Sequence, residues 1–383
     1  MTAAHETMVT RARDIAETVL KPAAWANDRD GRFSTEAVDA LGNTGLLALL
    51  LPAELGGAAL GPRAFADVMT ILAEADPSVA MVYLMHTLAA ATIAAATRND
   101  VSDRTLREIG AGRHLSTLAF SEAGSRSHFW APVSRARANG GGVALSAKKS
   151  FVTSAGFAHS YVVSALAPAA AGPTESTLYL VPCDAPGLSV SGKWDGLGLR
   201  ANASAPMLLE DCAIAATHQL TDDGAGFAAM LNVVLPLFNL GSACVSLGLC
   251  RAAVAAVTAH LKAARFEHLG QTLGEALPNL RTLLAGMVID TDGLATRIDD
   301  LVDHLERPRE TTLLRVLETK AAAGETSIGV TSAAMRAAGG AAFSRNTSID
   351  RLFRDAHAGA VMAPTSDTLR DFIGKAVLGM ELF

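Results

Sequence analysis

The sequence has 383 residues, of which 50% are hydrophobic and 18% charged, a composition typical of a globular protein with one large core or two to three packed subdomains. Its 32 basic and 38 acidic residues give a formal net charge of -6 and form no basic stripe, which argues against nucleic acid as a partner. The four cysteines lack paired spacing and the first residues include acids, so we expect no metal site, no disulfide framework, no signal peptide and a cytoplasmic protein.

The first part of the chain has the periodicity of helices. Between residues 11 and 112 apolar residues recur at spacings of three and four, as in RARDIAETVLKPAAWA and PRAFADVMTILAEADPSVAMVYLMHT,. The uncharged run at residues 78–97 is long enough to cross a bilayer, but its neighbours are amphipathic,. We therefore expect a helical domain over residues 1–113, with this run in its core and no membrane contact.

The middle of the chain has the pattern of short strands. Apolar and polar residues alternate in STLAFSE, GGGVALSAKKSFVTSA, HSYVVSALA and STLYLVPC, with glycine and proline between these segments,. A β domain is expected over residues 114–222.

Helical periodicity returns over residues 223–383, in long segments such as SACVSLGLCRAAVAAVTAHLKAARF and NLRTLLAGMVIDTDGLATRIDDLVDHLE. Long helices of this kind usually pack antiparallel as a bundle, and the apolar run at residues 225–250 suits the centre of one. The pattern therefore predicts the fold class α+β, in the order helical domain, β domain and helical bundle.

Motifs in all three zones resemble those of the acyl-CoA dehydrogenase family. They include LPAELGGAALGP and ADPSVAMVYLMHT in the first zone, FSEAGSRSHFW, KKSFVTSA and KWDGLGLRANAS in the second, and AAGGAAF with DRLFRDA in the third. Their order and spacing cover nearly the whole chain. The resemblance implies an α+β fold with an N-terminal helical domain, a central β-barrel-like domain and a C-terminal four-helix bundle. It also implies an oxidoreductase with FAD as cofactor, an acyl thioester of CoA or a carrier protein as substrate, and an electron-transferring flavoprotein or a flavin reductase as partner.

The resemblance also assigns flavin contacts in the β domain. It implies that Phe120 and Ser121 lie at the flavin and that Ser127 contacts the pyrophosphate, although Arg126 and His128 depart from the family pattern. In KKSFVTSA, the resemblance implies that Phe151 packs on the isoalloxazine and that Thr153 hydrogen-bonds flavin N5. The family more often has Trp at the position of Phe151. An ordinary half-buried strand would show the same alternation.

Further contacts are implied on the loops and the bundle. Arg200 corresponds to a loop near the pantetheine channel, although a lone loop arginine is usually a solvated surface charge. Thr365 matches a flavin-side threonine. The resemblance further implies residues that reach the FAD of a neighbouring subunit, and therefore a homo-oligomer, a dimer or tetramer. These residues are Arg265, Arg336, Gly339 and Gly340. The spacing from Arg265 to Leu269 and Gly270 is one residue longer than in the family.

The catalytic glutamate of the family is missing. An ungapped count from Gly339 and Gly340 puts Ala363 in its place, next to Met362. In some relatives the carboxylate stands on the central helix just before an arginine, and these two positions hold Phe238 and Asn239. Met362, Ala363, Phe238 and Asn239 are therefore expected to line a substrate pocket without a base.

Three explanations remain open. His86, Glu122 or Asp367 could take the proton in a variant dehydrogenation of a thioester, which the retained Arg200 and Thr153 favour, although a histidine on an apolar helix is more often a core residue. The chain could be the non-catalytic subunit of a hetero-oligomer. It could also be a two-component flavin-dependent monooxygenase of the same fold, acting on a small aromatic or amino substrate, as the absence of both bases favours. Of the three we favour the first, an enzyme of specialised metabolism that acts on a thioester-linked or similarly apolar substrate by a variant mechanism.

Overall fold

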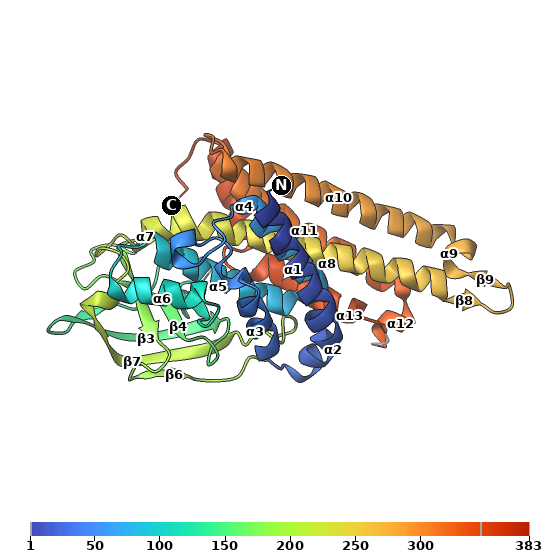
Figure 1. Cartoon of the computed structure of the whole chain (residues 1–383). Helices are drawn as coiled ribbons and strands as arrows, with labels where there is room; N and C mark the ends of the chain where they lie inside the picture. The colour runs from blue at the N-terminus through green and yellow to red at the C-terminus, as the bar shows by residue number, and fades with distance from the viewer. Residues whose placement is uncertain (1, 127, 345–346, 383) are drawn as a thin grey trace.

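The computed structural model describes residues 2–126, 128–344 and 347–382 and shows two helical regions flanking a β region (Figure 1). The expected α+β order of helical domain, β domain and helical bundle is confirmed. The N-terminal helices lie against the long C-terminal helices, and the sheets lie to one side of both (Figure 1).

Side-chain caps define several helices of the N-terminal domain. Thr2, Ser34, Asp76 and Asn99 each accept a hydrogen bond from a backbone N–H in the first turn of the helix that follows, which satisfies donors that the helix itself leaves free. The helices are α1 (Ala3–Ile15), α2 (Lys21–Asp30), α3 (Thr35–Asn43), α4 (Pro62–Ala75), α5 (Pro77–Ala95) and α6 (Asp100–Gly110), with a π-helical turn, η1 (Ala16–Leu20), joining α1 to α2.

The central domain is built from two sheets. One has the strand order β1-β4-β5, with β1 parallel to β4, and the other is antiparallel with the order β2-β3-β7-β6. The strands are β1 (Ser116–Ala119), β2 (Arg137–Ala138), β3 (Gly142–Val152), β4 (Ser160–Leu166), β5 (Ser176–Pro182), β6 (Leu188–Val190) and β7 (Ala205–Ala215).

The C-terminal bundle is organised around α11, which packs against α8, α10 and α13. α4 of the N-terminal domain packs on α8, so the two helical domains share one hydrophobic core. The elements are α7 (Gly226–Ala229), η5 (Met230–Val234), α8 (Leu235–Ala263), β8 (Arg265–Phe266), β9 (Gln271–Thr272), α9 (Leu273–Ala276), α10 (Pro278–Glu306), α11 (Thr312–Ala338), α12 (Gly340–Phe343), α13 (Ile349–Val361) and α14 (Ser366–Val377).

Two helical stretches in the described chain are long and apolar enough to cross a membrane, Pro77–Ala95 and Gly226–Ala263. The most apolar windows of these stretches are 78% and 83% buried inside the protein. Their apolar surfaces are therefore used in packing α4, α5 and α8 together, as expected of helices that are hydrophobic all round.

Candidate active site

A cavity of about 1010 Å³ is lined by residues from all three domains. Its apolar walls include Met81 and Met85 of α5, Phe129 of the loop after β1, Phe238 of α8 and Met362 at the end of α13. A volume of this size accommodates a large organic ligand. The cavity is also lined by five of the residues implied to contact the flavin, which makes it the candidate active site; they are Phe120, Ser121, Phe151, Thr153 and Thr365.

The implied flavin residues of β3 lie together at this cavity. The pairing of β3 with β7 shifts register between Lys149 and Val152, and Phe151 in this irregularity has a φ of +56°. Its ring is 68% exposed, lines the cavity and packs edge-on against Trp194 with centroids 6.3 Å apart. Such a backbone conformation is unfavourable for a bulky residue and often marks a functional position. The bulge thus presents an aromatic surface to the cavity.

Hydroxyl groups line the same cavity. Thr153 is buried, lines the cavity, and lies 3.0 Å from the Ser204 hydroxyl between their two oxygens. Phe120 and Ser121 line the same cavity. An open aromatic ring beside hydroxyl donors fits an isoalloxazine, which has two flat faces and a polar edge.

The loop after β1 provides a second part of the flavin fit. Gly124 has a φ of +103° and open space where a Cβ would project, so the backbone allows close approach of a ligand. Arg126 also lines the cavity, and arginine suits a diphosphate. Ser127, the implied pyrophosphate contact, lies outside the described residues.

The break between α13 and α14 forms another wall. Met362, Ala363 and Thr365 line the cavity, and Thr365 caps α14 by accepting a hydrogen bond from Thr368 N–H. Phe238 also lines it, but Asn239 does not. The Asn239 side chain is fully buried and donates to the Val316 carbonyl at 3.3 Å. Asn239 is therefore placed as a residue of the bundle core and not as a substrate contact.

Glu122 lines the cavity but is fully engaged. One carboxylate oxygen lies 2.6 Å from Lys149 Nζ and accepts from the Ser134 hydroxyl, and the other accepts from the N–H groups of Val133 and Ser134 at 2.9 and 2.8 Å. Burial alone would raise the pKa of Glu122, but Lys149 and these donors outweigh burial and lower it,. A carboxylate held ionised by four donors is a structural anchor, which corrects its assignment as the base.

His86 is also used structurally. Its ring is fully buried and does not line the cavity. Nε2 lies 3.0 Å from the Leu47 carbonyl, and Nδ1 accepts from Ser116 N–H at 3.0 Å. Burial lowers the pKa of His86 to about 4. Because both ring nitrogens are satisfied by backbone, His86 connects α5 to β1 and has no free lone pair for substrate. Asp367 is exposed on the first turn of α14, outside the cavity lining.

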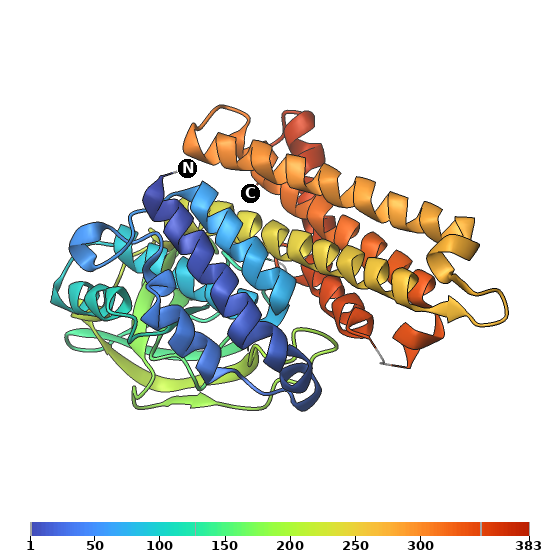
Figure 2. The ribbon, with the colours of Figure 1, turned by 45° about the vertical axis from the view of Figure 1, so that its right-hand side comes forward.

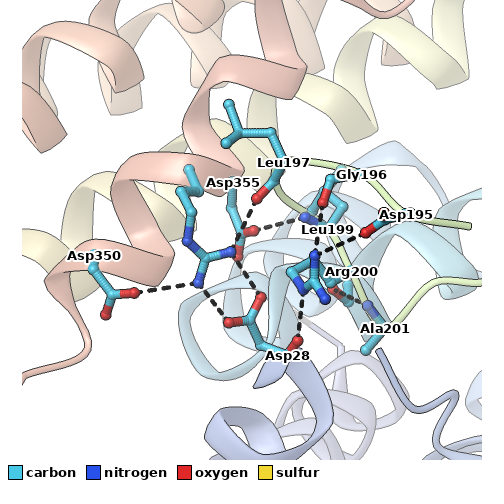
Figure 3. Close-up of polar contacts among 11 residues, drawn as sticks. Asp28, Asp195, Gly196, Leu197, Leu199, Arg200, Ala201, Asp350 and Asp355 are labelled. Atoms are coloured by element: carbon cyan, nitrogen blue, oxygen red, sulfur yellow. Dashed lines mark hydrogen bonds and ion pairs between the residues drawn. The ribbon is translucent and has the colours of Figure 1, made fainter. Parts of the chain in front are cut away.

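Arg200 likewise takes a structural place. Its guanidinium donates to the Asp28 carbonyl at 2.9 Å and the Gly196 carbonyl at 3.1 Å, and it pairs with Asp195 at 3.3 Å (Figure 3). Arg200 does not line the cavity. The expected thioester contact is thus replaced by a link between α2 and the loop before β7.

A neighbouring arginine that the sequence did not single out lies nearer the cavity. Arg354 of α13 lines it, pairs with Asp28 at 2.5 Å, and donates to the Leu197 carbonyl at 3.0 Å. In the same group, Asp355 accepts from Leu199 N–H at 2.7 Å (Figure 3), and burial raises the pKa of Asp355 to about 7. These contacts join α2, α13 and the loop that carries Trp194.

Two further residues near the helix break were missed. Lys320 of α11 is buried behind it and donates to the carbonyls of Gly359, Met362 and Pro364 at 3.2, 3.1 and 2.7 Å. His357 lines the cavity one turn before the end of α13. His357 and Val361 are four residues apart, and this spacing in the sequence predicts that they share one face of a helix.

The residues implied to reach a neighbouring FAD lie elsewhere. Arg265, Arg336, Gly339 and Gly340 are exposed and do not line the cavity. Figure 1 places β8 and β9 at the end of the bundle far from the β domain, and the turned view in Figure 2 agrees. Their contact with FAD therefore remains a prediction that requires a second copy of the chain.

The chain is similar to known proteins over nearly its whole length. The N-terminal, middle and C-terminal domains of acyl-CoA dehydrogenases match residues 2–113, 117–212 and 224–378. Short-chain specific acyl-CoA dehydrogenase of Bos taurus is 28% identical, covering 96% of this chain and 88% of that protein. The amino sugar nitrososynthase RubN8 of Streptomyces rubradiris is 29% identical, covering 94% and 87%.

Solved structures have the same fold. Butyryl-CoA dehydrogenase of Megasphaera elsdenii superposes with a TM-score of 0.92 at 20% identity, covering 99% of both chains. KijD3, solved in complex with dTDP, gives 0.87 at 25% identity, and PigA, solved with FAD and proline, gives 0.90 at 17%; each covers 99% of this chain and 98% of its own. FAD is the cofactor of this group, as expected from the motifs. Together with the cavity, these matches show that the chain belongs to the acyl-CoA dehydrogenase family.

Proposed function

We propose that the chain is a flavin-dependent monooxygenase that receives reduced FAD from a separate reductase and hydroxylates the nitrogen of a small amine, such as an amino sugar. One observation carries this proposal. Among the described residues that line the cavity, the single carboxylate is Glu122, and its oxygens are taken by Lys149, Val133 and Ser134. Dehydrogenases of this family use a carboxylate as the base for the carbon acid, and a general base is worth about 10²–10⁴-fold in rate.

Overall similarity does not choose between the two chemistries, because identity to the short-chain dehydrogenase and to the nitrososynthase is 28% and 29%. The local chemistry of the site supports the monooxygenase. Ala363 offers a methyl group where dehydrogenases of this family have a carboxylate, and Met362 and Phe238 add further apolar surface. An oxygenase does not need a carboxylate at this place, so an alanine there is compatible with oxygenation.

The residues of this chain position the reactants and exclude water. Phe151 and Trp194 offer ring surfaces to the isoalloxazine, and Thr153 offers a hydroxyl at its polar edge. When bound and reduced, FAD supplies two electrons to molecular oxygen, so that one oxygen atom enters the substrate and the other leaves as water. The apolar wall of Met81 and Met85 keeps bulk water from that reaction,. We further propose a cytoplasmic homo-oligomer in which Arg265 and Arg336 serve the neighbouring site.

A variant thioester dehydrogenase is the second candidate, supported by the match to the bovine short-chain enzyme over 96% of this chain. The test separates the two. The protein is supplied with a flavin reductase, NADH and FAD in air, with catalase and superoxide dismutase present, and a panel of amino sugars is assayed by mass spectrometry for one added oxygen atom. In parallel, butyryl-CoA is added without oxygen.

An oxygenated product that depends on the reductase supports the monooxygenase. Bleaching of the oxidised flavin by the thioester, with no oxygenated product, would establish the dehydrogenase instead. A protein that binds no FAD and gains activity only with a second polypeptide would identify a non-catalytic subunit.

A further inference from the structure

His357 is a half-buried residue of α13 whose side chain lines the cavity. Arg354, Ala358, Val361 and Met362 of the same helix also line it. Positions separated by three and four residues share one face of a helix, so the wall that contains the apolar helix break also contains an imidazole.

The contacts of His357 determine its tautomer. Nδ1 lies 2.7 Å from the Phe353 carbonyl oxygen, and a carbonyl accepts hydrogen bonds but cannot donate them. Nδ1 therefore carries the proton, and in the neutral ring Nε2 carries the lone pair. The ring of His357 also packs edge-on against Phe353, with centroids 4.7 Å apart. These two contacts hold the imidazole in one orientation on its own helix.

The other ionisable groups of the cavity cannot take a proton. In the described lining they are Glu122, Arg126 and Arg354. Arginine stays protonated in proteins, and Arg354 is paired with Asp28 and Asp350. Glu122 is held ionised by Lys149 and three other donors. Nε2 of His357 is left as the acceptor among these groups.

We propose that His357 is the catalytic base of the oxygenation, an inference that rests on the proposed function. A primary amine is protonated at neutral pH and has no lone pair with which to attack an oxygen atom. Transfer of one proton to Nε2 breaks an N–H bond, leaves its electron pair on the substrate nitrogen and produces an imidazolium on His357. That electron pair would form the N–O bond as the O–O bond breaks, with the second oxygen atom leaving as water on the two electrons that reduced FAD would supply, and the imidazolium then returns its proton to solvent.

The test uses His357→Gln, which keeps a polar side chain without the imidazole lone pair, and His357→Ala, which leaves room for free imidazole. His218→Ala is the matched control, because His218 belongs to a short turn, η4 (Ala216–His218), and does not line the cavity. Loss of a general base is expected to lower kcat by about 10²–10⁴-fold. FAD affinity and KM should be unchanged, and imidazole should restore part of the activity of His357→Ala alone.

A second readout does not depend on turnover. In protein labelled with ¹⁵N-histidine, the His357 signals should show the Nδ1–H tautomer, and the Nε2 signal should move when an amino sugar is added to the FAD-loaded protein. Undiminished kcat in both variants, or loss of FAD binding as the sole defect, would overturn the inference. If the wild type makes no oxygenated product, the proposed function is wrong. The role of His357 is tested separately, because an Nε2 signal that does not move when the amine is added would overturn it.

Discussion

The buried pair of Glu122 and Lys149 offers a decisive test of whether Glu122 is structural or catalytic. Glu122→Gln removes the charge that faces Lys149, whose side chain is fully buried. Removing one partner of a buried ion pair typically costs about 3–5 kcal/mol, because the other charge is left uncompensated. The new amide also places an NH₂ group among the N–H groups of Val133 and Ser134, where a carboxylate oxygen accepted hydrogen bonds.

This loss of unfolding free energy corresponds to a lower melting temperature, Tm. Unfolding entropy of about 2.1 cal/mol/K per residue gives about 0.8 kcal/mol/K for a chain of this length, so a loss of 3–5 kcal/mol lowers Tm by about 4–6 °C. Differential scanning fluorimetry with bound FAD measures it. The double variant Glu122→Gln/Lys149→Met should recover most of the loss, because neither charge then remains buried alone. A single variant that melts like the wild type but does not turn over would show that Glu122 is the base after all.

Acidification should weaken the same anchor. Because Lys149 and the surrounding donors lower the pKa of Glu122 below its ordinary value, its contribution is present above the unfolded-state pKa and is lost as the pH falls through the folded-state value. The wild type should therefore lose more unfolding free energy on acidification than the double variant does. Equal pH profiles for the two proteins would contradict this account of the pair.

Three further predictions follow from the other buried groups. Burial lowers the pKa of Lys320 from 10.5 to about 7. Between these pH values the unfolded chain binds one more proton than the folded chain, so the unfolding free energy should rise with pH. Denaturant titrations of Lys320→Met should lack that rise, and a pH dependence identical to that of the wild type would contradict the prediction. His86→Phe should lower Tm by leaving two backbone groups unpaired, at about 1–3 kcal/mol each, while the surviving folded protein keeps its kcat; a selective loss of kcat would restore His86 as a catalytic candidate. Asp28→Asn should weaken the ion pair with Arg354 and increase hydrogen exchange in residues 194–204, and unchanged exchange in that loop would refute the proposed link.

Several parts of the fold and the site were predictable because their signals are local. Helix periodicity and β-branched alternation near Thr153 act over a few residues of chain. The flavin-side motif and the alanine at position 363 were predictable for the same reason, because each is recognised from the residue types along a short segment. Phe151, Thr153, Phe238 and Met362 do lie together at the cavity.

What each polar side chain meets across the fold was decided only by tertiary structure. Glu122 and Lys149 are 27 residues apart and meet through an isolated bridge between β3 and the loop after β1. Arg200 finds the carbonyl of Asp28 at a separation of 172 residues. Sequence pattern indicates which side chains are able to donate, accept or ionise, but their partners depend on the packing of distant segments. The free energy of burying a charge therefore sets the role of each candidate base, and that term exists only in the folded chain.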